Sequence, residues 1–233
     1  LIGPMAKLGW GTPTLISLSL GILIEIPGNI AIVGKLTVAI PDERLPLIII
    51  QVAFVGAIEF DKKRGWFFAA LYESRIIFMP LDGGMGVLAA FGDDANFLVS
   101  VGGFHPSYNP PALPFPSIAR IAINILNTPL ARIRVDAYFA VTSNTVQFGA
   151  HAQLYFGISI ASIEGHLAFD ALFQFSPFYF NITISASLSV KLFGAGLFSE
   201  RFRGSLEGPS PWHVEGTGSI SLLFWDVDVD FSH

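Results

Sequence analysis

Residues 163–190 read IEGHLAFDALFQFSPFYFNITISASLSV, with an apolar residue at nearly every second position. Such alternation is typical of a β-strand with one apolar face, because successive side chains of a strand point to opposite sides of the sheet. The proline in Ser176-Pro177-Phe178 interrupts the pattern and predicts a turn. We therefore expect two long antiparallel strands joined by a tight hairpin.

The same alternation recurs along most of the 233-residue chain, for example over residues 16–26, 48–60 and 133–156. Several runs extend for about 12 to 14 residues, where strands usually have about five or six. At about 3.3 Å per residue, such strands span roughly 40 Å. The pattern predicts an all-β fold: long antiparallel amphipathic strands in a meander that forms a curved sheet, a barrel or a sandwich with a large apolar interior.

The composition is unusually apolar for a β protein in water. Only 13% of residues are charged, hydrophobic residues make up 52%, and the mean hydropathy is +0.59. Either a large share of the chain is buried or part of it faces something other than water. The net charge of −5, without a basic cluster, argues against a nucleic-acid partner. The absence of cysteine excludes disulfides and thiolate metal sites.

A proline-rich segment lies near the middle of the chain. Residues 103–116 include five prolines, and proline lacks the amide donor that a strand ladder needs. We expect an N-terminal β meander over 1–102, a proline-rich loop over 103–116 and a C-terminal β meander over 117–233. The two meanders can also form one continuous sheet or barrel. Because the chain begins at Leu1 and not at methionine, we expect it to be a piece of a larger protein.

Turn positions predict the strand register of the C-terminal meander. A two-residue turn at Ser143-Asn144 places Asp136 opposite His151, and Phe139 opposite Phe148. Turns at 157–158 and 177–178 then place Glu164 opposite His151 in one neighbouring strand and opposite Lys191 in the other.

Together these registers predict one polar row across four strands, made of Asp136, His151, Glu164 and Lys191. A histidine between carboxylates can serve as a general acid–base or as part of a metal site. A charge ladder that sets the register is the favoured explanation of the row, since no nucleophile or third ligand stands out. We therefore predict no catalytic residue, no metal site and no cofactor.

Three further features have structural explanations. His105 lies in a Gly-Gly-Phe-His-Pro turn, where capping the turn is the favoured interpretation. Asp226, Asp228 and Asp230 have a calcium-ligand spacing, but on a strand every second residue points to the same side. The apolar positions change parity near Leu223, from Leu222 and Phe224 to Trp225 and Val227, which predicts a β-bulge.

A long sheet with one apolar face has to cover that face. The function that we expect first is binding of a lipid or another apolar small molecule along the face by a non-catalytic module of a larger protein. The alternatives are a structural or assembly module that contacts flanking domains or self-associates, a membrane β-barrel and, least favoured, an enzyme. The predicted ligand-binding residues are Phe139, Phe148, Leu154, Phe156, Leu167, Phe169, Phe173, Phe175, Ile182 and Ile184.

Several short stretches resemble a known protein family. They are GGFHP at 102–106, TVQFG at 145–149, GHLAFD at 165–170, FQFSPF at 173–178, SLEGP at 205–209 and SIS at 219–221. Together they resemble a family of unknown function, DUF6603, found in large, mostly bacterial proteins. The resemblance implies a β-rich module within a larger protein, which in some members is associated with contractile injection systems. It implies no activity and no catalytic residues.

Overall fold

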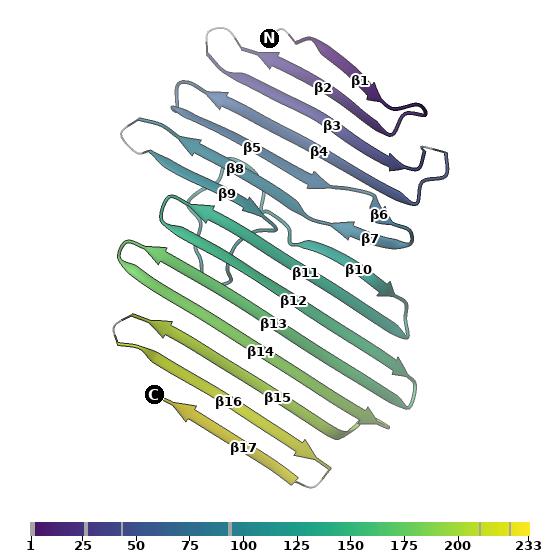
Figure 1. Ribbon diagram of the computed structural model, residues 1–233, viewed down its shortest axis with the longest axis vertical. Coiled ribbons are helices and arrows are strands. Elements are labelled where there is room, and N and C mark those ends of the chain that lie inside the picture. Colours follow the sequence, from purple (N-terminus) through teal and green to yellow (C-terminus); the bar gives the residue numbers. More distant parts are fainter. Residues whose placement is uncertain (1–2, 26–27, 43, 93–94, 210, 224) are drawn as a thin grey trace. The chain divides into compact units, whose positions relative to one another are not determined.

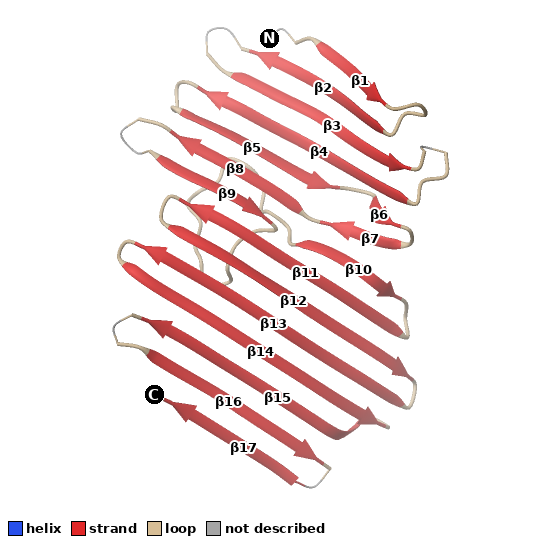
Figure 2. Cartoon of the chain, in the orientation of Figure 1, coloured by secondary structure: helices blue, strands red, loops and turns tan. Residues whose placement is uncertain are grey.

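The computed structural model of the protein describes residues 3–25, 28–42, 44–92, 95–209, 211–223 and 225–233. Within these ranges the chain forms strands, turns and loops but no helix (Figure 2). It follows that the described residues include no helix long and apolar enough to cross a membrane. The strands pair antiparallel with their neighbours along the chain, so the predicted all-β, antiparallel meander is confirmed.

The chain divides into two compact units. Unit 1 comprises residues 1–103, 109–121 and 140–143, and unit 2 comprises residues 104–108, 122–139 and 144–233. The proline-rich segment that we predicted as a loop contains no described strand. Its residues divide between the units, since 104–108 belong to unit 2 and the residues from 109 onwards to unit 1.

Unit 1 is an antiparallel meander in which β1 to β5 pair in order, and β5 then pairs with β8 and β8 with β9 (Figure 1). The short hairpin of β6 and β7 lies beside β4. The strands are β1 (Met5–Trp10), β2 (Ile16–Ile24), β3 (Ile30–Ile40), β4 (Ile48–Glu59), β5 (Arg64–Leu71), β6 (Ser74–Ile76), β7 (Met79–Asp82), β8 (Gly84–Ala90) and β9 (Asn96–Val101).

The proline-rich segment has a packing role in unit 1. Phe115 is 8% exposed, and its ring stacks on Phe68 of β5 with 5.8 Å between centroids. Trp66 of the same strand lies 6.0 Å from Phe115. An aromatic side chain therefore anchors this strand-free segment on the sheet of unit 1.

Unit 2 contains the longest strands, and from β12 onwards each strand pairs with the next (Figure 1). Most of β10 and β11 and all of the later strands belong to it. The strands are β10 (Ile121–Asn127), β11 (Ala131–Thr142), β12 (Thr145–Ile158), β13 (Ala161–Phe175), β14 (Phe178–Leu192), β15 (Ala195–Gly208), β16 (His213–Leu222) and β17 (Trp225–Ser232).

The register between β12 and β13 differs from the predicted one by four residues. The chain reverses after Ile158, which pairs with Ala161, so His151 lies opposite Ala168 and not opposite Glu164. Gly157 suggested a turn, but it remains in the strand and its N–H donates to the carbonyl of Leu130 at 2.8 Å. The glycine instead leaves room for the Tyr155 side chain, because a Cβ at position 157 would lie 2.3 Å from the Tyr155 hydroxyl.

The register between β13 and β14 differs from the predicted one by two residues. Phe175 pairs with Phe178, so the turn residues are Ser176 and Pro177, and Phe169 lies opposite Ile184 and not opposite Ala186. Asn144, in the preceding hairpin, stabilises this turn with two hydrogen bonds. Its side chain accepts a hydrogen bond from the Ser176 N–H at 2.8 Å and donates to the Ser176 carbonyl at 2.7 Å.

The bulge predicted near Leu223 is wrong. Leu222 of β16 pairs directly with Trp225 of β17, so the change of parity marks a hairpin between two strands and not an extra residue within one. Phe224, which that prediction also involved, lies outside the described residues. A register irregularity does occur between β14 and β15, at Val190 and Lys191.

Candidate functional site

One face of β12, β13 and β14 carries no polar side chain. All residues of these strands are described, and the strand register places the same-face residues side by side. We call this surface the apolar face; across the three strands it consists of Val146, Phe148, Ala150, Ala152, Leu154, Phe156, Ile158, Ala161, Ile163, Gly165, Leu167, Phe169, Ala171, Phe173, Phe175, Phe178, Phe180, Ile182, Ile184, Ala186, Leu188, Val190 and Leu192.

Much of the apolar face is exposed. Leu167 and Phe175, near the middle and the end of β13, are 52% and 56% exposed. Of the ten predicted ligand-binding residues, only Phe173 and Ile182 are half-buried, and the other eight are exposed. Apolar residues also occur on this face in β17, where Trp225, Val227, Val229 and Phe231 are exposed, although Glu200 of β15 lies between in the register. The sequence therefore identified a contiguous surface, and ligand binding there stays a prediction.

Aromatic rings run across the apolar face from strand to strand. Phe148 of β12 lies 6.0 Å from Phe169 and 6.3 Å from Phe173 of β13, measured between ring centroids. Phe173 in turn lies 6.4 Å from Phe180 of β14. These offset pairs make a continuous ring surface that holds its shape, since neighbouring aromatic side chains favour such geometries.

The opposite face of unit 2 carries a hydrogen-bonded charge network around His151. His151 Nδ1 lies 3.2 Å from Asp136 Oδ2, and His151 Nε2 lies 3.1 Å from Asp170 Oδ1. The Tyr138 hydroxyl donates to the same Asp170 oxygen at 2.8 Å. The two carboxylate side chains are 10% and 12% exposed.

The backbone makes room for this network at Gly149 of β12. A Cβ at Gly149 would lie 2.4 Å from the Tyr138 ring and 2.7 Å from Asp170 Oδ1. Both ring nitrogens of His151 are engaged by carboxylates within the protein. The geometry is that of a structural charge network, which is the interpretation that the sequence favoured over a general acid–base.

The predicted polar row is present only as two separate pairs. Asp136 contacts His151 as predicted, and Lys191 Nζ lies 3.1 Å from Glu164 Oε1. The single row is wrong, because the observed register of β12 and β13 places His151 opposite Ala168. Glu164 and Lys191 meet diagonally, since Glu164 lies opposite Ser189.

The comparison with known protein families confirms the resemblance that the sequence stretches indicated. The sequence profile of a family of unknown function, DUF6603, matches residues 1–233, the whole chain. The chain belongs to the DUF6603 family. No curated protein and no solved structure shows a significant similarity to it.

The loop histidine of this DUF6603 chain caps a turn. His105 is 3% exposed, its Nδ1 accepts a hydrogen bond from the Ser107 N–H at 3.1 Å, and its carbonyl accepts one from Tyr108 at 2.9 Å. The His105 N–H donates to Gln147 Oε1 at 2.9 Å, and Gln147 is fully buried. The turn-capping interpretation of His105 is therefore confirmed.

The three aspartates of β17 lie side by side on the polar side of the DUF6603 sheet. Asp226, Asp228 and Asp230 face Ser221, Ser219 and Thr217 of β16. The Ser221 hydroxyl donates to Asp226. Among the described residues no group of three or more acidic, histidine or cysteine side chains is arranged to hold a metal ion.

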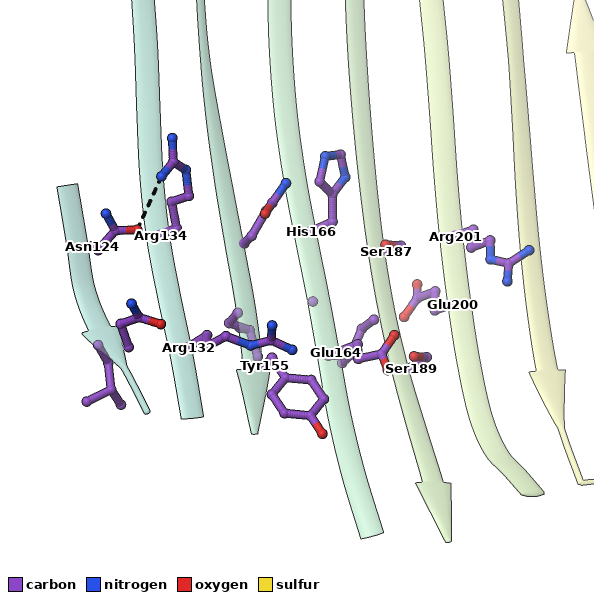
Figure 3. A pocket seen from close by; sticks show the side chains of 16 residues that line it. Asn124, Arg132, Arg134, Tyr155, Glu164, His166, Ser187, Ser189, Glu200 and Arg201 are labelled. Carbon is purple, nitrogen blue, oxygen red and sulfur yellow. Dashed lines mark hydrogen bonds between the residues drawn. The ribbon is translucent and has the colours of Figure 1, made fainter. Parts of the chain in front are cut away.

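Sequence reasoning missed a cavity on the polar side of the DUF6603 sheet. An open trough of about 660 Å³ crosses β11 to β15, with Arg132 and Arg134 toward one end and Arg201 toward the other (Figure 3). His166 and Ser187 lie between them. Neither the trough nor the contact of Asp170 with His151 was predicted. Both depend on the register of β12 and β13, which the turn positions did not give correctly. The alternation does place Asp170 on the side of Glu164 and His166, which was the available signal.

Proposed function

We propose that this DUF6603 chain is a non-catalytic module that binds the acyl chains of lipids along the apolar face of unit 2. The observation that supports the proposal is the composition of that face over β12, β13 and β14. Every side chain there is apolar, although most of the larger ones are exposed. Exposed apolar patches of this kind usually mark an interaction surface.

The lack of polar groups favours an acyl chain over a protein as the occupant. Protein–protein interfaces carry about one hydrogen bond per 100–200 Å², so both partners supply donors and acceptors. The apolar face supplies none from its side chains, and the antiparallel ladder uses the backbone groups of β13 on both sides. A hydrocarbon chain needs no hydrogen bonds, and burying each methylene contributes about 0.8 kcal/mol.

The dimensions also suit a hydrocarbon chain. β13 and β14 each contain 15 residues, and at about 3.3 Å per residue such strands extend for roughly 50 Å. A surface of that length accommodates an extended acyl chain that lies along the strands. The packed rings of Phe148, Phe169 and Phe173 form part of the surface that such a chain would contact.

Native mass spectrometry of chain purified without detergent, combined with lipid extraction of the same sample, tests the proposal. We expect bound acyl species at a fixed stoichiometry. A homogeneous, ligand-free mass would contradict it. A ligand-free dimer would support instead the alternative that the face is an assembly surface between copies.

A matched pair of variants localises the binding. Leu167→Asp places a charge on the apolar face at a position that is 52% exposed, so the charge stays solvated and the fold should persist. Ser162→Asp places the same charge on the polar face of the same strand. We expect acyl binding to be lost in Leu167→Asp and retained in Ser162→Asp. If Leu167→Asp unfolds the protein, Leu167 belongs to a packed core and the proposal fails.

A further inference from the structure

The open trough on the polar side of unit 2 carries positive charge in a chain whose net charge is −5. Glu164, which also lines the trough, is paired with Lys191 at 3.1 Å. Glu200 also lines the trough, next to Arg201 in the chain (Figure 3). Among the described residues, Arg132, His166 and Arg201 have no carboxylate within ion-pair distance. Arg132, Arg134 and Arg201 face Glu164 and Glu200 in the lining, and Arg134 lies 3.8 Å from Asp136, so the trough keeps a small excess of positive charge.

The strand register spaces these groups regularly. His166 of β13 lies opposite Ser187 of β14, and Ser187 lies opposite Arg201 of β15, so the three form one row. With neighbouring strands about 4.8 Å apart, β11 and β15 are separated by roughly 19 Å. The trough thus presents a few cationic groups, widely spaced, with hydroxyl groups between them (Figure 3).

One of the cations is held in place by an aromatic ring. The Arg132 guanidinium lies over the ring of Tyr155, 4.6 Å from its centroid. Such a stacked guanidinium keeps its donors available at the edge while its orientation is restricted. Arg134 is fixed as well, since its Nη1 donates to Asn124 Oδ1 at 3.2 Å (Figure 3).

We propose that this trough binds an acidic oligosaccharide, a sugar chain that carries carboxylate groups. Arg132 and Arg201 would bind two carboxylates of such a chain, and Ser187, Ser189 and Gln153 would bind its hydroxyl groups, all of which line the trough. Arginine suits carboxylates because its planar fork matches both oxygens.

The spacing of charge separates this ligand from a nucleic acid. Double-stranded DNA carries one charge per about 1.7 Å and is bound by dense Lys and Arg patches, and single strands stack on several aromatic side chains. The trough has sparse cations and Tyr155 as its aromatic lining residue. The arginine and serine side chains of the trough lie on the polar side of the sheet, and Leu154 and Leu188 of the apolar face also border it.

Isothermal titration calorimetry with tetragalacturonate, at low salt and on the full chain, tests the site. We expect binding that weakens as ionic strength rises, because exposed charges are screened. Arg201→Gln should weaken it about tenfold, as expected for one charge-assisted hydrogen bond, and Arg201→Lys should restore part of it. Arg75→Gln, an exposed arginine of β6 in unit 1, is the charge-matched control and should change nothing.

Each other outcome overturns the assignment. Absence of tetragalacturonate binding rejects the site, and equal binding of neutral maltotetraose rejects the role of the cations. Equal weakening by Arg75→Gln shows a non-specific charge effect. If a short oligothymidylate binds more tightly than tetragalacturonate, and Arg201→Gln abolishes that binding, the ligand of the trough is a nucleic acid and not a sugar. Circular dichroism of each variant shows that the fold is kept.

Discussion

His151 stands between two carboxylates that are almost wholly removed from solvent. Its ring nitrogens lie 3.2 Å and 3.1 Å from oxygens of Asp136 and Asp170. His213, in contrast, meets Glu215 at 3.4 Å where both side chains are more than half exposed. Exposed ion pairs contribute about 0–1 kcal/mol, whereas removing one partner of a buried pair leaves an uncompensated charge.

This contrast gives a matched pair of variants. His151→Leu leaves the carboxylates of Asp136 and Asp170 without their shared partner, and we expect it to lower the free energy of unfolding by about 3 kcal/mol. His213→Leu should change it by less than about 0.5 kcal/mol. Urea denaturation of both variants at neutral pH provides the measurement. Equal effects would show that the His151 network contributes no more than a surface pair.

Glu59 of unit 1 makes stability depend on acid pH. The Arg64 guanidinium, which donates a hydrogen bond to Glu59, holds the pKa of that carboxyl below its ordinary value, with a smaller contribution from Lys62. A lowered folded-state pKa means that the stabilisation is complete above the ordinary glutamate pKa of about 4.3 and is lost as the pH falls through the folded-state value.

We therefore expect wild-type stability to decline relative to Glu59→Gln as the pH falls below about 4.3. Urea midpoints of the two proteins across this acid range provide the comparison. Glu25→Gln, at an exposed carboxyl of unit 1, is the control and should track the wild type. Parallel curves for wild type and Glu59→Gln would show that the pair with Arg64 adds nothing in solution.

At the scale of the strand, the alternation predicted which side chains share a face, but the turns were misplaced. The predicted registers of β12–β13 and β13–β14 differ from the observed ones by four and two residues. Because the side-chain period of a strand is two, even shifts leave every residue on the same face. The apolar face was therefore predicted correctly, while contacts between particular residues, such as His151 with Glu164, were not.

The turn positions depend on contacts that local sequence does not display. Gly157 has the appearance of a turn glycine, but it accommodates Tyr155 and its N–H bonds to Leu130. Ser176 is fixed by the side chain of Asn144, which is 32 residues away in sequence. The trough and the contact of His151 with Asp170 follow from these registers, so neither could be predicted without them.

Engineered cysteines can measure the register of β12 and β13 directly, because the chain contains no cysteine of its own. Ala152 lies opposite Leu167, whereas the predicted register placed it opposite Ile163. Directly opposite residues have Cα atoms about 4.5–5.5 Å apart, within disulfide range. We expect a disulfide in Ala152→Cys/Leu167→Cys and none in Ala152→Cys/Ile163→Cys, as read by mass spectrometry after mild oxidation. The reverse result would restore the predicted register.

At the scale of the whole chain, the structure shows where the many apolar side chains lie. The mean hydropathy of +0.59 reflects in part large apolar side chains that remain exposed, among them Met5 and Trp10 in unit 1 and Phe175 and Trp225 in unit 2. A buried core therefore does not account for all of the apolar composition.

Lipid binding at the apolar face should therefore stabilise the fold. A ligand that binds only the folded state at about one hundred times its dissociation constant adds roughly 2.7 kcal/mol. We expect delipidated wild type to melt at a lower temperature than the same protein reloaded with fatty acid, in differential scanning calorimetry. Leu167→Asp should show no such difference. A fatty-acid effect of equal size in Leu167→Asp would place the binding elsewhere.

The two-residue period of side chains along a strand also limits which insertions and deletions the strands can accept. Loss of a single codon within β13 would turn part of the strand over, so that apolar side chains such as Phe169 would exchange sides with polar ones such as Asp170. Loss or gain of a codon pair would shorten or lengthen the strand and preserve its sides. Insertions and deletions tolerated within these strands during evolution should therefore come in even numbers of residues.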